Sequence, residues 1–171
     1  MFSLKLSTVS LELICLSSAQ LKALIEGLQP DPYSVDTSFS RDVLQATATK
    51  RRKMAVQPSS FHPWYSYWLI YHKKDALGIG VAGYKGKPTV HGEVELGYEL
   101  LPHYRQQGYM SEALPALLTW AFDSGAKCVT AKDVLKTNLA SQRVLEKLGM
   151  RIYDETLTCL YYRLKQKERL R

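Results

Sequence analysis

The chain has 171 residues, with 23 lysines and arginines against 16 aspartates and glutamates, and a formal net charge of +7. This length suits one compact domain with a sizeable core and is too short for two ordinary domains, so we expect a single domain over residues 1–171. The basic balance favours an anionic partner, which could be nucleic acid, an acidic membrane or a phosphate-rich small molecule, although a scattered excess of cations is also usual on a solvated surface.

The spacing of the cysteines and histidines and the length of the apolar runs exclude several further classes of protein. The three cysteines are odd in number and far apart, which argues against a disulfide framework and for a reducing compartment. The four histidines lack metal-ligand spacing, so no metal site is predicted. The first apolar stretch is interrupted by Glu12, and no run approaches the roughly 20 residues of a membrane span. We therefore expect a cytoplasmic protein that makes no membrane contact.

The first third of the chain predicts a strand and two helices. A strand is expected over 9–16 and a helix over 17–27, where Ser17 and Gln20 have capping-box spacing. After a turn-rich segment, residues 38–56 have a helical pattern that ends in the cluster Lys50, Arg51, Arg52 and Lys53. Four cations at a helix end complement the helix dipole, and this interpretation is favoured over a contact with an anionic partner.

The middle of the chain changes to a strand pattern. Strands are expected over 64–72, 77–85 and 90–101, and their short connections predict an antiparallel meander. Apolar and polar residues alternate cleanly in the third of these strands. One face carries Val94, Leu96, Tyr98 and Leu100, and the other carries Glu93, Glu95, Gly97 and Glu99.

The last third alternates between helices and strands. Apolar residues at helical spacing predict helices over 108–125 and 138–149, with a strand over 127–134 between them. Two closing strands are expected over 150–155 and 158–165. The whole pattern predicts an α+β, or mixed α/β, fold.

The segment "HYRQQGYMSEAL", residues 103–114, joins a predicted strand to a predicted helix. The helix begins with free backbone N–H groups and the positive end of its dipole, and Gly108 lets a ligand approach the backbone closely. Arg105 can add a charge-assisted hydrogen bond, so the loop suits an anion such as a pyrophosphate. The alternative is that Gly108 only makes the turn and Arg105 is solvated.

A second polar pair opens the next predicted helix. Asn138 suits the N-cap position and Ser141 follows three residues later. Both could be ordinary first-turn residues. However, they follow a neighbouring strand, where side chains can reach a ligand extended along the sheet.

The run "ELGYELLPHYRQQGYMSEALPALLTWAF" and the later "NLASQRVLEKLGM" resemble the acetyl-coenzyme A-binding region of the GNAT family of N-acetyltransferases. The resemblance is strong from about Glu93 to Met150, and within the family it is closest to the ribosomal-protein alanine N-acetyltransferases. It implies a GNAT fold, in which helices flank a central, splayed, mostly antiparallel sheet of about six to seven strands.

The resemblance also implies a set of acetyl-coenzyme A contacts. Backbone amides of the loop would hold the pyrophosphate with help from the Ser111 hydroxyl, and the pantetheine arm would run beside the end of the preceding strand. Asn138 would bind the pantetheine or the substrate region, and Ser141 would lie near the thioester sulfur. The loop residues are Arg105, Gln106, Gln107, Gly108, Tyr109 and Met110, and the strand-end residues are Leu100 and Leu101.

One departure from the family pattern concerns the leaving group. Leu145 stands where many members have the tyrosine that protonates the departing thiolate. Ser141 or an ordered water would then have to stabilise or protonate the sulfur, and Tyr153 is a weaker candidate. Met110 replaces a common glycine or alanine, which the resembling branch tolerates.

The resemblance implies transfer of an acetyl group directly from the thioester to an amine. An amine is nucleophilic only when it is neutral, so a base must accept its proton. Glu95 is the favoured base, acting through water; Glu93 and Glu99 share its face, and a solvated strand carboxylate is the alternative. Backbone amides near Leu100 could polarise the thioester oxygen.

We therefore expect an acetyl-CoA-dependent N-acetyltransferase for a primary amine, either a protein amino terminus or a small molecule, in a monomer or homodimer. A noncatalytic acyl-CoA-binding regulator is the alternative suggested by Leu145. Nucleic-acid binding by residues 50–53 and the aromatic run 64–71 is not favoured, because aromatic residues in a central strand more often fill a core. The sequence does not identify the acceptor; candidate pocket residues are Tyr33, Phe61, Trp64 and Tyr65.

Overall fold

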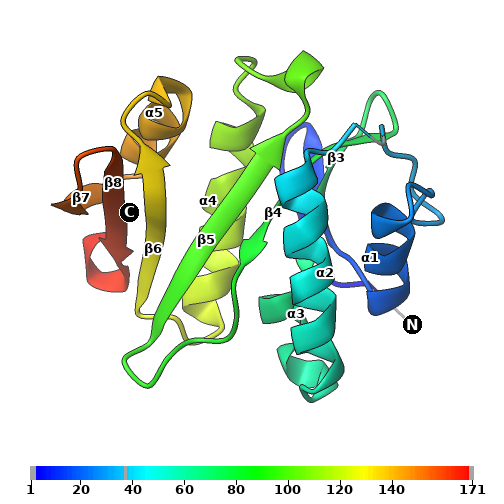
Figure 1. The fold of residues 1–171 in the computed structure, drawn as a ribbon, viewed down its shortest axis with the longest axis horizontal. Helices are drawn as coiled ribbons and strands as arrows, with labels where there is room; N and C mark the ends of the chain where they lie inside the picture. The colour runs from blue at the N-terminus through cyan, green and yellow to red at the C-terminus, as the bar shows by residue number, and fades with distance from the viewer. Residues whose placement is uncertain (1–2, 37, 170–171) are drawn as a thin grey trace.

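The computed structural model describes residues 3–36 and 38–169, and within them one sheet of eight strands has the order β1-β2-β3-β4-β5-β6-β8-β7 (Figure 1). The strands are β1 (Lys5–Ser7), β2 (Leu11–Cys15), β3 (Tyr67–His72), β4 (Leu77–Tyr84), β5 (Glu93–Leu100), β6 (Cys128–Leu135), β7 (Arg151–Glu155) and β8 (Cys159–Lys165). The helices are α1 (Ser18–Ile25), α2 (Arg41–Ala55), α3 (His62–Tyr65), α4 (Tyr109–Asp123) and α5 (Leu139–Lys147). The mixed α/β fold predicted from the sequence is confirmed.

Two details of the predicted elements are wrong. The sequence predicts six to seven strands, and β1 is the additional one: its three residues pair antiparallel with β2 but are too few to show an alternating pattern. The strand expected from Trp64 begins only at Tyr67, because residues His62–Tyr65 form the short helix α3 with a proline in its first turn.

The sheet splits between its two central strands. Strands β5 and β6 pair in parallel over only three positions, Glu93 to Glu95 against Cys128 to Thr130. Every other pairing between named strands is antiparallel. Because β5 continues to Leu100 and β6 to Leu135, the two strands diverge beyond the paired region. Their inner backbone groups beyond this point therefore have no partner strand.

Helices cover both faces of the sheet. Helices α1 and α2 pack on the near face in Figure 1, where their apolar residues join Leu69 and Val81 in one buried cluster. Helix α4 packs on the far face, and its apolar residues join Leu145 of α5 in a second cluster. No helix among the described residues has the length and apolarity required to cross a membrane.

The helix ends follow the signals in the sequence. Ser17 and Gln20 form the predicted capping box at the start of α1. Ser40 caps α2, and the last turn of α2 contains Arg52 and Lys53, as the dipole interpretation predicts. That interpretation is wrong for Lys50, which lies earlier in the helix and is buried.

The aromatic run at the start of the meander fills the core. The ring centroids of Trp64 and Trp120 are 4.5 Å apart, and those of Trp68 and Trp120 are 4.9 Å apart. Trp64 and Trp68 are buried, and Trp120 belongs to α4. These rings therefore join the sheet to α4 and are not exposed for stacking against nucleic-acid bases.

Glu112 attaches the first turn of α4 to the turn between β1 and β2. Its carboxylate accepts hydrogen bonds from the backbone N–H of Ser10 at 2.7 Å, from the Ser10 hydroxyl at 2.6 Å and from the Thr8 hydroxyl. Burial opposes ionisation of Glu112, but the hydrogen bonds from Ser10 and Thr8 outweigh it and lower the pKa of the carboxyl group. The negative charge also complements the helix dipole.

We expect Glu112→Ala to lower the free energy of unfolding by about 2 kcal/mol at neutral pH, because the charged acceptor of several hydrogen bonds is lost. A carboxyl group with a lowered pKa in the folded state stabilises the fold above its unfolded pKa, and this stabilisation is lost as pH falls through the folded pKa. Urea denaturation at several pH values measures both effects. Glu26→Ala, which removes an exposed carboxylate at the C-cap of α1, is the control; an equal loss in both variants would contradict the role of Glu112.

Candidate active site

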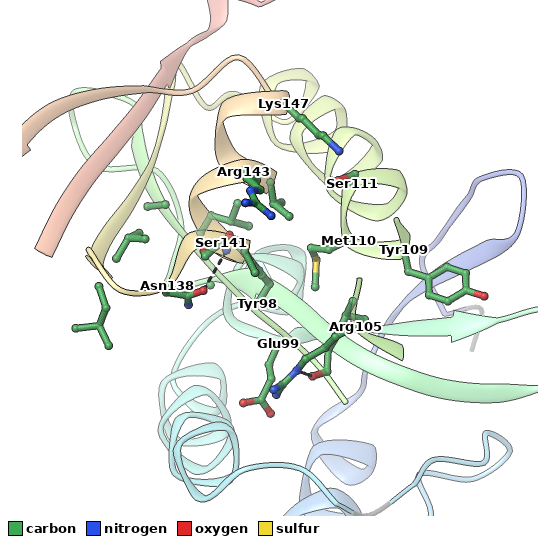
Figure 2. Close-up of a pocket in the computed structure, with 18 of the residues that line it drawn as sticks. Tyr98, Glu99, Arg105, Tyr109, Met110, Ser111, Asn138, Ser141, Arg143 and Lys147 are labelled. Atoms are coloured by element: carbon green, nitrogen blue, oxygen red, sulfur yellow. Dashed lines mark hydrogen bonds between the residues drawn. The ribbon is translucent and has the colours of Figure 1, made fainter. Parts of the chain in front are cut away.

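A cavity of about 830 Å³ lies where β5 and β6 diverge (Figure 2). Its walls are residues 96–100 of β5, residues 131–135 of β6, the loop before α4, the first turn of α4 and one face of α5. This volume is within the range of about 300–1,000 Å³ that is usual for small-molecule sites. The cavity is therefore large enough for an extended ligand that lies between the two strands.

The loop before α4 presents a helix N-terminus to the cavity. Gly108 is the N-cap residue with φ = +84°, and no side chain caps the helix. Gln106 also has positive φ, +60°. A side chain at Gly108 would meet no atom within 4 Å, so the backbone conformation, rather than crowding, is the reason for glycine. The uncapped N–H groups and the helix dipole suit an anion.

The side chain of Arg105 is partly engaged by the protein itself. Its Nε donates a hydrogen bond to the carbonyl oxygen of Leu100 at 2.9 Å, which joins the loop to the end of β5. Arg105 is exposed and lines the cavity, so it combines a structural contact with a positive charge in the cavity wall. The sequence suggested only the second of these roles.

Most of the predicted ligand contacts lie around this cavity, but three residues do not. Leu101 is buried in the cluster beneath α1 and α2, and its N–H donates to the carbonyl of Ile79. Gln107 donates a hydrogen bond to the carbonyl of His103 at 2.8 Å and stabilises the loop. Glu95 lies on the opposite face of β5. The predicted residues that line the cavity are Leu100, Arg105, Gln106, Gly108, Tyr109, Met110, Ser111, Asn138 and Ser141.

The start of α5 positions a serine in the cavity. Asn138 is the N-cap, as predicted, and its Oδ1 accepts a hydrogen bond from the N–H of Ser141 at 3.1 Å. The Ser141 hydroxyl lies 2.6 Å from the hydroxyl of Tyr98 on β5. Burial raises the pKa of Tyr98, and the hydrogen bond with Ser141 acts in the opposite direction. Tyr98 was expected from the sequence only on the apolar face of its strand, without a functional role.

Two cations of α5 were also missed. Arg143 and Lys147 line the cavity, and Figure 2 shows both extending from α5 towards the start of α4. Their spacing of four residues places them on one face of a helix, which was a usable signal. With Arg105, they add positive charge to the cavity lining.

The three glutamates of β5 have different partners on the α2 face. Glu95 forms an ion pair with Lys85, and 21% of its side chain is exposed. Glu93 pairs with Lys132 at 3.1 Å. Glu99 accepts a hydrogen bond from the N–H of Ser40 at 3.3 Å, and Figure 2 shows its carboxylate pointing away from Ser141. Of the two glutamates that form ion pairs, Glu95 has the more buried side chain, although it does not line the cavity.

Other residues considered from the sequence lie elsewhere. Leu145 is fully buried in the core, and Tyr153 lies on β7, outside the cavity. None of the three cysteines lines the cavity. Among the described residues, no group of three or more histidine, cysteine, aspartate or glutamate side chains could hold a metal ion.

A sheet split beside an uncapped helix N-terminus, with cations in the cavity lining, forms a site that suits an elongated anionic ligand between two strands. Residues 11–151 match the family model described as "Acetyltransferase (GNAT) domain", and the chain therefore belongs to this family. The resemblance noted in the sequence is thus confirmed.

Known proteins agree with this assignment. The "Uncharacterized N-acetyltransferase YjdG" of Bacillus subtilis (strain 168) is 32% identical over 85 residues, which are 50% of this chain and 51% of that protein. The match spans about half the length of this curated relative. The structure of a ribosomal-protein-S5-alanine acetyltransferase from Vibrio fischeri aligns with a TM-score of 0.72 at 15% identity, covering 98% of this chain and 100% of the other.

A second solved structure is the ribosomal L7/L12 α-N-protein acetyltransferase RimL in complex with coenzyme A. It aligns with a TM-score of 0.66 at 18% identity and covers 95% of this chain and 98% of the other. At these identities the two structures establish the shared fold, and they place ribosomal-protein acetyltransferases among the structural neighbours.

Proposed function

We propose that the protein is an acetyl-CoA-dependent N-acetyltransferase that moves an acetyl group directly from the thioester to a primary amine, on a protein amino terminus or a small molecule. The observation that carries the proposal is the 830 Å³ cavity between β5 and β6, which ends at the uncapped N-terminus of α4. The absence of a cysteine from its described lining supports direct transfer without a thiol intermediate.

The cavity has groups that suit the phosphates, the pantetheine arm and the thioester of acetyl-CoA. The N–H groups at the start of α4, with Arg105, Arg143 and Lys147 nearby, suit the phosphates. The unpaired inner edge of β5 beyond Glu95 suits the pantetheine amides, which would take the place of a neighbouring strand. Backbone N–H groups on this edge can also polarise the thioester oxygen.

The reaction requires two proton movements on opposite faces of β5. As the amine nitrogen bonds to the acetyl carbon, its proton passes to Glu95, directly or through water, and the carbon–sulfur bond breaks. The departing thiolate receives a proton through the Ser141 hydroxyl, which is held against Tyr98 and takes a proton from solvent in the same step. Lys85 forms an ion pair with Glu95 and so holds the carboxylate in place on this face of β5.

The deciding experiment measures release of the coenzyme A thiol by the purified protein with acetyl-CoA and panels of amines and peptide amino termini. The proposal expects acceptor-dependent thiol release together with an acetylated product detected by mass spectrometry. Binding of acetyl-CoA without thiol release across the panel would contradict it and favour the noncatalytic regulator.

We expect Arg143→Gln and Lys147→Gln each to weaken acetyl-CoA binding about threefold to tenfold, because each removes one exposed cation from the phosphates. Isothermal titration calorimetry measures the Kd, and the effect should shrink at high salt. Lys22→Gln removes an exposed lysine of α1, outside the cavity, and serves as the control. Equal affinity in all four proteins would exclude the two α5 residues from the phosphate site.

A further inference from the structure

A second, smaller cavity of about 190 Å³ lies on the α2 face of the sheet. It is bounded by α2 and by residues of β3, β4 and β5, and three of its lining side chains are lysines: Lys50, Lys53 and Lys85. Whole small molecules usually occupy about 300–1,000 Å³, so this cavity suits one functional group of a larger ligand.

Lys50 is an unusual component of this wall because it is buried. Only 8% of the residue is exposed, its ammonium group donates a hydrogen bond to the carbonyl of Tyr84, and Nζ lies 4.6 Å from the ring centroid of Tyr67. None of the ion pairs found among the described residues includes Lys50. Burial lowers the pKa of Lys50 to about 7, and Lys53 and Lys85 act in the same direction.

An unpaired ammonium group in this position is costly, since burial of a charge normally requires an opposite charge beside it. Glu95 neutralises Lys85 through their ion pair. Lys50 and Lys53 then remain as the uncompensated charges of the cavity wall. An anion placed between them would supply the missing partner and favour the charged form of Lys50.

The small cavity adjoins the proposed site of acetyl transfer. Gly97 of β5 lines both cavities, and a side chain at Gly97 would meet no atom within 4 Å. Side chains alternate along β5, so this open position lies on the same face as Glu95. Lys85 contacts the proposed base and also lines the small cavity. A group bound there is therefore next to an amine that approaches Glu95.

We propose that this lysine-lined cavity selects the acceptor by binding a side-chain carboxylate of the molecule that carries the reacting amine, so that the preferred acceptor is an acidic amino acid or a peptide amino terminus with an acidic side chain. This inference rests on the proposed acetyltransferase function. Lys50 and Lys53 bind the carboxylate, and the open surface over Gly97 lets the amine reach the thioester.

The test compares isosteric acceptors that differ only in charge. The pairs are free glutamate with glutamine, and alanyl tetrapeptides with glutamate or glutamine at the second position. We expect kcat/KM from thiol release to favour the acidic member of at least one pair about 10- to 100-fold, the usual effect of a hydrogen bond to a charged group. The pair that shows the preference distinguishes a free amino acid from a peptide.

Variants assign that preference to the cavity. Lys53→Gln and Lys50→Met should each reduce the ratio between the acidic and neutral acceptor by about tenfold, mainly through KM. Arg52→Gln removes an exposed charge from the same helix outside the cavity and should leave the ratio unchanged. Lys53 is exposed, so its variant tests the proposal even if Lys50→Met fails to fold. A ratio near one in the wild type, or a ratio unaffected by Lys53→Gln, would overturn the proposal.

A binding measurement separates this inference from the function on which it rests. Calorimetry with coenzyme A present compares N-acetylglutamate with N-acetylglutamine, and the acidic and neutral acetylated tetrapeptides, as product analogues. Preferential binding of an acidic analogue that is lost in Lys53→Gln, without acetylation of any acceptor, would support the cavity and reject the acetyltransferase. Acetylation of acidic and neutral acceptors at equal rates would support the acetyltransferase and reject carboxylate selection by the cavity.

Discussion

Replacement of Glu95 by glutamine is expected to lower kcat about 100- to 10,000-fold while the Kd for acetyl-CoA stays unchanged. This range is the usual contribution of a positioned general base. Glutamine keeps the shape of the side chain but cannot accept the proton of the attacking amine. Because Glu95 lies on the α2 face, away from the cavity between β5 and β6, its loss should not disturb cofactor binding.

The pH dependence makes this prediction specific. As pH rises above the pKa of the acceptor amine, the amine becomes neutral without help, so the difference between wild type and Glu95→Gln should narrow. Glu93→Gln is the matched control, since Glu93 shares the face and pairs with Lys132. Undiminished turnover by Glu95→Gln at neutral pH would exclude Glu95 as the base. A larger loss in Glu93→Gln would indicate that Glu93 is the base.

The fold and the cofactor loop could be predicted because their signals are local. Alternation in 93–100, the capping residues at Ser17 and Asn138, and the glycine at 108 each depend on a few neighbouring residues. These short patterns fixed the order of the elements and placed the loop at the end of β5. The three-residue strand β1 was missed because no pattern fits into so short a segment.

The remaining site residues depend on contacts between distant segments. Tyr98 and Ser141 are 43 positions apart, and their hydrogen bond arises only where β5 diverges from β6. Lys50 belongs to a run of four cations that read as the exposed end of a helix, yet the helix continues to Ala55 and turns Lys50 into the protein. Charge runs do not reveal which member is buried, because that depends on the element packed against them.

Leu145 stands where many family members have a tyrosine. The hydrogen-bonded pair of Tyr98 and Ser141 can take over the role of that tyrosine. The two hydroxyl oxygens are 2.6 Å apart, and burial raises the pKa of Tyr98, so the phenol stays protonated and acts as a donor. Either hydroxyl can donate in this pair; we propose that Tyr98 donates to the Ser141 oxygen, which leaves the Ser141 hydroxyl free to donate to the sulfur. In this arrangement Ser141 is the catalytic residue and Tyr98 is a positioning residue.

We therefore expect Ser141→Ala to lower kcat about 100-fold and Tyr98→Phe about 10-fold, with cofactor Kd unchanged within about twofold. Tyr71→Phe, which removes a tyrosine hydroxyl of β3 outside the cavity, is the control. Both losses should shrink with an acetyl thioester whose leaving thiol is more acidic, because such a thiolate needs less protonation. A loss in Ser141→Ala alone would show that the serine acts without the tyrosine. Full activity in both variants would mean that water protonates the thiolate. The hydrogen bond between β5 and α5 would then have only a structural role.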